Sequence, residues 1–191
     1  RAVASTFFSW AVSIGIAPEN IVANRTARPK SRPTPLHPFK PDALRAALDV
    51  ITGHSEKKID VTDHQRDELL AFVALGTFAG LRASEIMRAD WSELDFKAGE
   101  IEVPISKDDQ TRTVTMTDAA RAWLKPIAKP AGPIISNPDH FEAGKPLKML
   151  RKAVRELGHE WPTNAPRATF ATVHFLLNGK DANKTILQTG H

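Results

Sequence analysis

The sequence predicts a mainly α-helical fold with a small antiparallel β-sheet, an α+β protein of 191 residues. Apolar residues recur at helical spacing in most of the chain, whereas residues 99–105 and 111–116 alternate polar and apolar residues as strands do. A third segment, residues 24–41, holds five prolines and fits neither a helix nor a central strand. With 41% hydrophobic residues, the chain is apolar enough for a packed core.

The N-terminal part predicts one short helix and a linker. Residues 1–14 carry a wide apolar face and end at Gly15. Because so short a helix is marginal alone in water, we expect residues 1–23 to end a domain whose beginning is not in this sequence. Residues 24–41 then form an extended linker, either a plain spacer or a basic strap for a phosphate backbone. The basic residues of this strap are Arg25, Arg28, Lys30 and Arg32.

The rest of the chain predicts helices around one hairpin. We expect helices over residues 42–51, 64–79, 118–128, 145–157, 166–178 and 181–189, and a short one after Ser84. Asp42, Ser84, Asp118 and Asp181 are the expected N-caps. Residues 91–96 lead into a strand, and the polar turn 106–110 joins the two alternating segments into a hairpin.

Charge is distributed unevenly along the chain, although the net charge is only +4. Residues 1–40 contain six basic residues and one acidic residue. Residues 41–144 contain 12 basic and 18 acidic residues, and residues 145–191 contain eight basic and three acidic residues. Two basic ends around an acidic middle favour a polyanionic partner such as nucleic acid. A solvated surface with uneven charge is the alternative.

Several chemistries lack their sequence signatures. The chain has no Cys, which excludes a disulfide scaffold, thiol catalysis and cysteine-ligated zinc. Glycine-rich phosphate loops, the His-Glu-x-x-His motif and the Gly-x-Ser-x-Gly nucleophile elbow are absent from the sequence. We therefore expect no metal ion and no other cofactor, and the apolar runs are too short to predict a membrane span.

Single basic residues stand at the edges of the expected elements. Arg82 follows the apolar helix, and Lys107 lies in the turn of the hairpin. Arg167 falls in the first turn of a helix, and His191 is the last residue. Because an Arg at a helix start opposes the helix dipole, a bound anion there is favourable. Taken singly, each residue is more simply a surface cation or half of a salt bridge.

Taken in order, these residues resemble the catalytic domain of the tyrosine recombinases, the phage-integrase family. Residues 77–86 (TFAGLRASEI) are similar to the family's box Thr-Gly-Leu-Arg-x-Ser-Glu-Ile. Residues 105–114 (ISKDDQTRTV) are similar to the hairpin that bears the family's lysine. Residues 164–172 (NAPRATFAT) and 187–191 (LQTGH) are similar to His-x-x-Arg-His-Thr-Phe-Ala-Thr and the later Leu-Gly-His.

The resemblance implies a tyrosine-recombinase-type catalytic domain over residues 42–191 and the end of a core-binding, DNA-binding domain over residues 1–23. It also implies a reaction that cuts and rejoins DNA through a covalent 3′-phosphotyrosyl intermediate, without metal or nucleotide. Such a reaction gathers negative charge on the phosphate oxygens, which positioned cations stabilise.

Five catalytic residues follow from the same resemblance. Arg82 and Arg167 are implied to clamp the scissile phosphate, since each guanidinium can bond two oxygens. Lys107 is implied to protonate the leaving 5′-oxygen, and His191 to hydrogen-bond the phosphate. Asn164 stands where the family has histidine; it can bond a phosphate oxygen but cannot shuttle a proton near neutral pH.

The nucleophile of the family is a tyrosine shortly after the Gly-His pair, and this sequence contains no Tyr. We expect the full-length protein to continue past His191, with a Tyr about ten residues on, one to two helical turns into the next helix. The 191-residue chain is then expected to bind a target phosphate but to be inactive in strand cleavage.

The sequence thus predicts a site-specific DNA recombinase or integrase with double-stranded DNA as its partner. We expect a tetramer on DNA, a monomer without DNA, no membrane association, and a cytoplasmic protein encoded by a bacterium, phage or mobile element. Two alternatives stay open. One is a non-catalytic, sequence-specific DNA-binding relative, and the other is an unrelated helical protein with chance matches, which would show no salt-dependent DNA binding.

The strap has a direct test. Charge reversal at Arg28, Lys30 and Arg32 is expected to weaken binding of duplex DNA about equally on every sequence, because phosphate contacts carry no sequence information. Fluorescence anisotropy with two unrelated duplexes measures this effect. A large loss confined to one of the two duplexes would contradict the strap.

Overall fold

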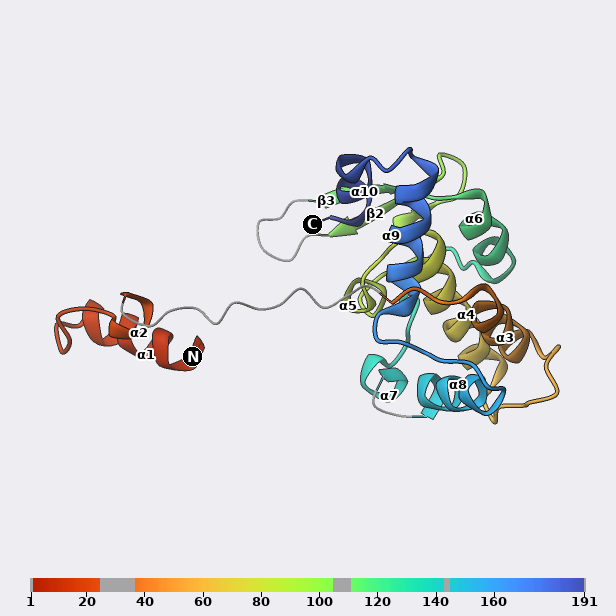
Figure 1. Cartoon of the computed structure of the whole chain (residues 1–191), viewed down its shortest axis with the longest axis horizontal. Helices are drawn as coiled ribbons and strands as arrows, with labels where there is room; N and C mark the ends of the chain where they lie inside the picture. The colour runs from red at the N-terminus through yellow and green to blue at the C-terminus, as the bar shows by residue number, and fades with distance from the viewer. Residues whose placement is uncertain (1, 25–36, 105–110, 143–144, 191) are drawn as a thin grey trace. The chain divides into compact units, whose positions relative to one another are not determined.

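The computed structural model describes residues 2–24, 37–104, 111–142 and 145–190. The chain divides into two compact units, residues 1–35 and residues 36–191. Figure 1 shows the helices and strands of each unit along the chain.

The first unit contains α1 (Ala2–Ser13) and the single turn α2 (Ile21–Asn24). Asn20 joins them, because its side-chain amide donates to the Ser5 carbonyl oxygen and to the Ser9 hydroxyl, both at 2.8 Å. Its side-chain oxygen accepts from the Ala23 N–H at 3.0 Å, which caps α2. The helix expected over residues 1–14 is confirmed, whereas α2 was not expected.

The second unit is mostly helical and contains one three-stranded antiparallel sheet, so the predicted fold class is confirmed. Its elements in chain order are α3 (Pro41–Thr52), α4 (Asp63–Phe78), α5 (Ala83–Ile86), η1 (Trp91–Glu93), β1 (Leu94–Asp95), β2 (Glu100–Pro104), β3 (Thr111–Thr115), α6 (Asp118–Leu124), η2 (Lys125–Ile127), α7 (Pro138–Glu142), α8 (Lys145–Glu156), α9 (Ala165–Leu177) and α10 (Ala182–Thr189).

Helix α4 is the centre of this unit. It packs against α3, α5, α6, α8 and α9 (Figure 1). A helix with neighbours on most sides must be apolar around most of its circumference, and Leu69, Val73 and Leu75 are fully buried. Thr62 begins the helix with a reciprocal capping box, in which its hydroxyl accepts from the Gln65 N–H at 3.2 Å. The apolar pattern of residues 64–79 thus predicts both the helix and its burial.

The sheet follows from the alternating pattern of the sequence. Strands β2 and β3 pair antiparallel, with Ile101 opposite Val114 and Val103 opposite Arg112. The short strand β1 extends the sheet on the other side of β2, where Leu94 lies opposite Ile101. Ile101 and Val114 face the core and are fully buried. The predicted hairpin is confirmed, and its turn at residues 105–110 lies outside the described residues.

Several helix starts differ from the expected ones. Asp181 caps α10 as expected, but α3 begins at Pro41, one residue before Asp42. Proline suits the first helical position, because its missing N–H has no helical partner there. Helix α6 is capped by the hydroxyl of Thr117, and Asp118 is its first residue.

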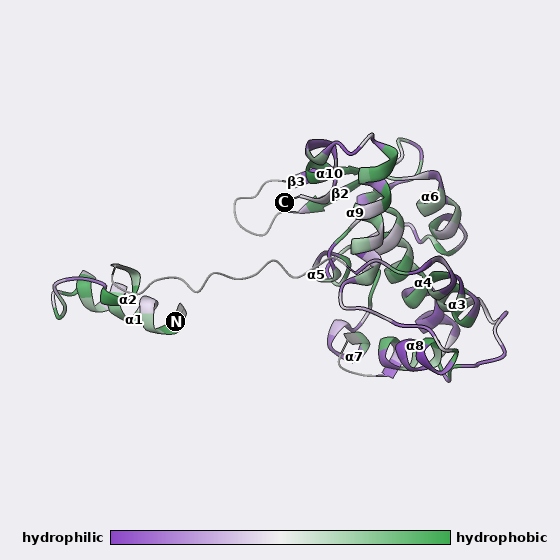
Figure 2. Cartoon of the chain, viewed as in Figure 1, coloured by the Kyte–Doolittle hydropathy of each residue, from purple (hydrophilic) through white to green (hydrophobic). Residues whose placement is uncertain are grey.

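Two element ends also differ from the expected ones. Helix α6 ends at Leu124 and continues as the 3₁₀ turn η2, so the helix expected over residues 118–128 changes type before its end. The short helix α7 was not expected from the sequence. In Figure 2, hydrophilic and hydrophobic bands both appear on α8, in keeping with the amphipathic helix predicted over residues 145–157.

Glycine residues allow α4 and α9 to approach each other closely. A Cβ atom on Gly76 would lie 2.7 Å from the Cβ atom of Pro166, so only glycine permits this crossing. Gly80, which follows α4 with φ 74°, has no room for a side chain beside the Phe170 ring. Because Gly80 lies close to α9, Arg82, two residues later, lies near the start of α9.

The crossing can be tested with Gly76→Ala. Helix propensity alone would stabilise the protein by about 0.5–1 kcal/mol, because alanine is the better helix former. We expect the opposite sign, a loss of about 1–3 kcal/mol, since the added methyl group collides with Pro166. Urea unfolding followed by circular dichroism measures the change, and a raised unfolding midpoint would contradict the packing.

Candidate active site

Arg82 is held in place by the turn between α4 and α5. Its backbone N–H donates to Glu85 Oε2 at 2.7 Å, and its Nη1 donates to Glu85 Oε1 at 2.8 Å. Arg82 itself is the N-cap residue of α5, so the expected cap Ser84 is wrong. The carboxylate at the third helical position serves the N-terminal N–H instead, as in a capping box. Glu85 therefore holds both the backbone and the side chain of Arg82.

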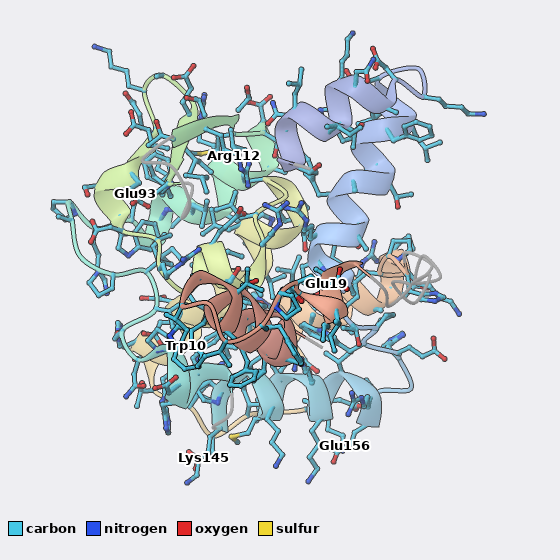
Figure 3. The ribbon with its side chains drawn as sticks, turned by 90° about the vertical axis from the view of Figure 1, so that its left-hand side faces the viewer. Trp10, Glu19, Glu93, Arg112, Lys145 and Glu156 are labelled. Atoms are coloured by element: carbon cyan, nitrogen blue, oxygen red, sulfur yellow. The ribbon has the colours of Figure 1, made fainter. Side chains whose placement is uncertain are left out.

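Arg112 approaches the same carboxylate from the sheet. Its Nη2 donates to Glu85 Oε2 at 2.7 Å, and its Nη1 donates to the Gln188 carbonyl oxygen at 2.9 Å. The side chain is only 12% exposed. In Figure 3, Arg112 lies on the sheet beside the C-terminal helices. One guanidinium therefore connects β3 to both α5 and α10.

Arg167 comes from the first turn of α9. Its Nη1 donates to the Gly80 carbonyl oxygen at 2.6 Å, and its Nη2 donates to the Thr189 carbonyl oxygen at 2.6 Å. The first contact depends on the close crossing of α4 and α9. Arg82 and Arg167, which are 85 residues apart in the sequence, both donate to the carboxyl end of α10.

The carboxyl end of α10 accepts from all three arginines. The carbonyl oxygen of Gln188 accepts from Arg112, that of Thr189 from Arg167 and that of Gly190 from Arg82. The last carbonyls of a helix lack intrahelical partners and carry partial negative charge, so they attract guanidinium groups. Gly190 ends α10 with φ 65°, and a Cβ atom there would lie 2.6 Å from Arg112 Nε.

Arg82, Arg112, Arg167 and Glu85 form a charged cluster, and their charges influence one another. Burial acts to raise the pKa of Glu85, but hydrogen bonds from the Arg82 backbone and Arg112 outweigh it, so its pKa lies below the ordinary value. Burial, and then the nearby charge of Arg82, lowers the pKa of Arg167 to about 10. At neutral pH the arginines are protonated and Glu85 is ionised. Three arginines stand against one carboxylate, which leaves these four residues with a net positive charge.

An open cleft of ≈ 680 Å³ lies beside these arginines. Arg82 and Arg167 line it, together with Asn164, which adopts the left-handed conformation with φ 57°. Asparagine tolerates this conformation better than most residues. The Asn164 side chain makes no capping hydrogen bond to α9. Its amide therefore belongs to the surface of the cleft rather than to the helix start.

Two further arginines line the same cleft from α8. Arg151 and Arg155 are four residues apart and share one face of the helix. The Arg151 guanidinium lies 5.9 Å from the centroid of the Trp161 ring, a cation–π distance. Together with Arg82 and Arg167 they give the cleft a strongly basic lining.

The structure brings together Arg82, Asn164 and Arg167 of the predicted site. Lys107, His191, Arg25, Arg28, Lys30 and Arg32 lie outside the described residues. Sequence reasoning missed Arg112, although it stands in the same alternating phase as the buried Val114, where a charged residue is unexpected. It also missed the two arginines of α8, whose spacing on an amphipathic helix was a usable signal.

The described residues contain no group of three or more His, Asp or Glu side chains that could hold a metal ion. No helix formed by these residues is long and apolar enough to span a lipid bilayer.

Comparison with known proteins identifies the family. The sequence model of the phage integrase family matches residues 48–191. The chain belongs to the phage integrase family. Among curated proteins, no sequence matches this integrase-family chain.

Solved structures share the fold of this family member at low sequence identity. The integrase of mycobacterium phage Brujita has a TM-score of 0.57 at 20% identity, over 100% of this chain and 61% of its own. The Tn1549 transposon integrase, in complex with a circular intermediate DNA, has a TM-score of 0.63 at 19% identity, over 98% and 68%. A lambda integrase dimer bound to a COC′ core site has a TM-score of 0.56 at 18% identity, over 100% of this chain and 69% of the lambda integrase chain. The chain thus spans about three fifths to two thirds of these proteins.

Glu85→Gln tests the charge balance of the cluster. Removing the carboxylate leaves like charges together, so we expect a loss of about 2–4 kcal/mol in unfolding free energy, less than for a fully buried pair because Arg82 is 38% exposed. Since folding lowers the pKa of Glu85, its contribution is fully present above its ordinary value of 4.5 and is lost as the pH falls through the lowered value.

The difference between wild type and Glu85→Gln is therefore expected to shrink below the ordinary pKa of a glutamate. Denaturant unfolding at neutral and acidic pH measures it. The control is Glu102→Gln, at an exposed position of β2. Equal effects of the two substitutions at neutral pH would contradict the charge balance.

Proposed function

We propose that this chain is part of a tyrosine-type site-specific recombinase, or integrase, which cuts and rejoins double-stranded DNA through a 3′-phosphotyrosyl intermediate. The nucleophilic tyrosine of this reaction is not in this chain. The observation that carries the proposal is the convergence of Arg82 and Arg167, from separate elements, on one open basic cleft.

The cleft suits a phosphodiester in transfer. Charge that develops on the non-bridging oxygens is stabilised by donors that are already in place and need no reorganisation. Each guanidinium carries five N–H groups in a planar fork that matches the oxygens of a phosphate group. Both guanidinium groups line the cleft, where a phosphate oxygen can accept from them.

Three other residues complete the proposed chemistry. Lys107 protonates the leaving 5′-oxygen, and His191 hydrogen-bonds the phosphate. Asn164 donates its amide to a phosphate oxygen and takes no part in proton transfer. No cofactor takes part in this reaction.

The domain assignment belongs to the same proposal. Residues 1–23 end a core-binding domain, residues 24–41 form the strap, and residues 42–191 form the catalytic domain. Arg25, Arg28, Lys30 and Arg32 bind backbone phosphates. Two of the similar solved structures are DNA complexes, which supports duplex DNA as the partner. The protein is a monomer that assembles as a tetramer on DNA in the cytoplasm, and a bacterium, a phage or a mobile element encodes it.

A suicide duplex, in which the cleaved end is trapped, tests the function in the full-length protein. Wild type is expected to form a covalent protein–DNA adduct, and Arg167→Lys to form it about 100-fold more slowly, because lysine cannot bond two oxygens from a planar fork. Arg45→Lys, at an exposed position of α3, is the matched control and is expected to react like wild type.

The non-catalytic alternative rests on Asn164 at the proton-transfer position and on the absence of Tyr from this sequence. Sequence-specific duplex binding by a full-length protein that forms no adduct would favour this alternative over recombination. DNA binding that does not weaken with salt would contradict both functions, since phosphate contacts impose a steep salt dependence.

A further inference from the structure

The geometry points to Arg112 as a positioning residue of the proposed phosphodiester site. It acts through Glu85 and through the carboxyl end of α10, and it fixes the orientation in which Arg82 and Arg167 face the cleft. This inference rests on the proposed function, because it assigns a role within the same site.

The first step of the argument is the shared carboxylate. Glu85 Oε2 accepts from both the Arg82 backbone N–H and Arg112 Nη2, while Oε1 accepts from the Arg82 side chain. Without Arg112, the carboxylate loses one of the two groups that hold Oε2 and can rotate about its side chain. Because Oε1 orients the Arg82 guanidinium, that rotation moves a proposed phosphate ligand.

The second step is the docking of α10. Arg112 Nη1 bonds the Gln188 carbonyl oxygen, and the next two carbonyls bond Arg167 and Arg82. The neighbouring strand residue Thr115 adds a further hold, since its N–H donates to the Gln188 side-chain oxygen at 3.2 Å. A shift of the α10 end therefore reaches both proposed phosphate ligands. Arg112 brings β3 into this contact and also donates to Glu85.

The third step separates positioning from direct binding. Arg112 is nearly buried, and it is not among the described residues that line the cleft. Its two Nη atoms point to two different elements, α5 and α10. A planar fork can span both elements, whereas the single ammonium of lysine cannot satisfy the same two acceptors. Arg112→Lys thus removes the geometry and keeps the charge.

A stabilising role alone makes a different prediction. Replacing a buried charged residue by an apolar one of similar size is often tolerated by the fold, although leaving its partner unpaired costs stability. We therefore pair Arg112→Lys with the double variant Arg112→Met/Glu85→Gln, in which no charge is left unpaired between these two positions. The double variant serves only as a control for folding, because Glu85 itself orients Arg82. If positioning is the role of Arg112, Arg112→Lys folds and loses the orientation of Arg82.

Orientation can be measured without any cleavage. Arginine-labelled NMR of the 191-residue chain reports side-chain N–H groups, and Arg82→Lys and Arg167→Lys assign the signals by their loss. In Arg112→Lys, we expect the Arg82 signal to shift or broaden, whereas Arg45→Lys leaves it unchanged. An unchanged Arg82 signal in folded Arg112→Lys would overturn the inference, whatever the protein does to DNA.

Reaction kinetics test the consequence in the full-length protein. We expect Arg112→Lys to slow adduct formation on the suicide duplex by about 100-fold, since misplacement of a reacting group by about 1 Å has effects of that size. The salt dependence of duplex binding is expected to stay as in wild type, because no phosphate contact is lost. Parallel loss of DNA affinity and thermal stability, with a normal rate for bound DNA, would overturn positioning in favour of a structural role.

The NMR signal of Arg82 and the rate of adduct formation distinguish a failure of this inference from a failure of the proposed function. An adduct in wild type with an unaffected rate in Arg112→Lys overturns only the positioning role. A disturbed Arg82 signal together with no adduct in full-length wild type supports the positioning of Arg82 and overturns the proposed function.

Discussion

Three arginine side chains donate to one helix end, two of them also share one carboxylate, and the arrangement of the second unit depends on that balance. Like charges about 4 Å apart near a protein surface repel each other by roughly 4 kcal/mol, so such a cluster disperses without compensation. Glu85 compensates one charge, and the carbonyls of residues 188–190 contribute the negative end of a helix dipole. A positive balance remains, as the proposed binding of a phosphodiester requires.

The close approach of the three arginines also depends on glycine at three positions. Gly76 lets α9 cross α4, Gly80 leaves room for Phe170, and Gly190 leaves room for Arg112. Each position places a backbone segment within hydrogen-bond reach of a guanidinium. Adding a methyl group at any of them acts on the site through the backbone, so packing and chemistry are joined at these three positions.

Much of the fold could be predicted from the sequence because its signals are local. The period-2 segments gave β2 and β3, and helical periodicity gave α4, α8 and α9 within one or two residues. Helix starts were less certain, since neighbours such as Thr117 and Asp118 compete for the same cap position. Helix α7 is only five residues long, and its sequence carries no apolar periodicity that could announce it.

The site shows the same division between local and distant information. Arg82 and Arg167 stand at element edges, where a cation is conspicuous in the sequence, and the structure places both on one cleft. Arg112 sits inside a strand, and its partners Glu85 and Gln188 are 27 and 76 residues away. A strand pattern shows that a charge faces inward but not what it meets there. For that reason the resemblance pointed to the two proposed phosphate ligands, whereas the contacts of Arg112 with Glu85 and Gln188 became visible only in the folded chain.

The lowered pKa of Arg167 adds a final consequence of this geometry. Burial and the neighbouring arginines disfavour its charged form, yet at a pKa of about 10 it remains protonated at neutral pH. An anion in the cleft reverses the sign of its surroundings and favours that charge again. Binding and folding are therefore linked, because a ligand that binds only the folded chain stabilises it by mass action. In the proposed function, the repulsion that the carboxyl end of α10 offsets in the free protein would contribute to the affinity for a phosphate.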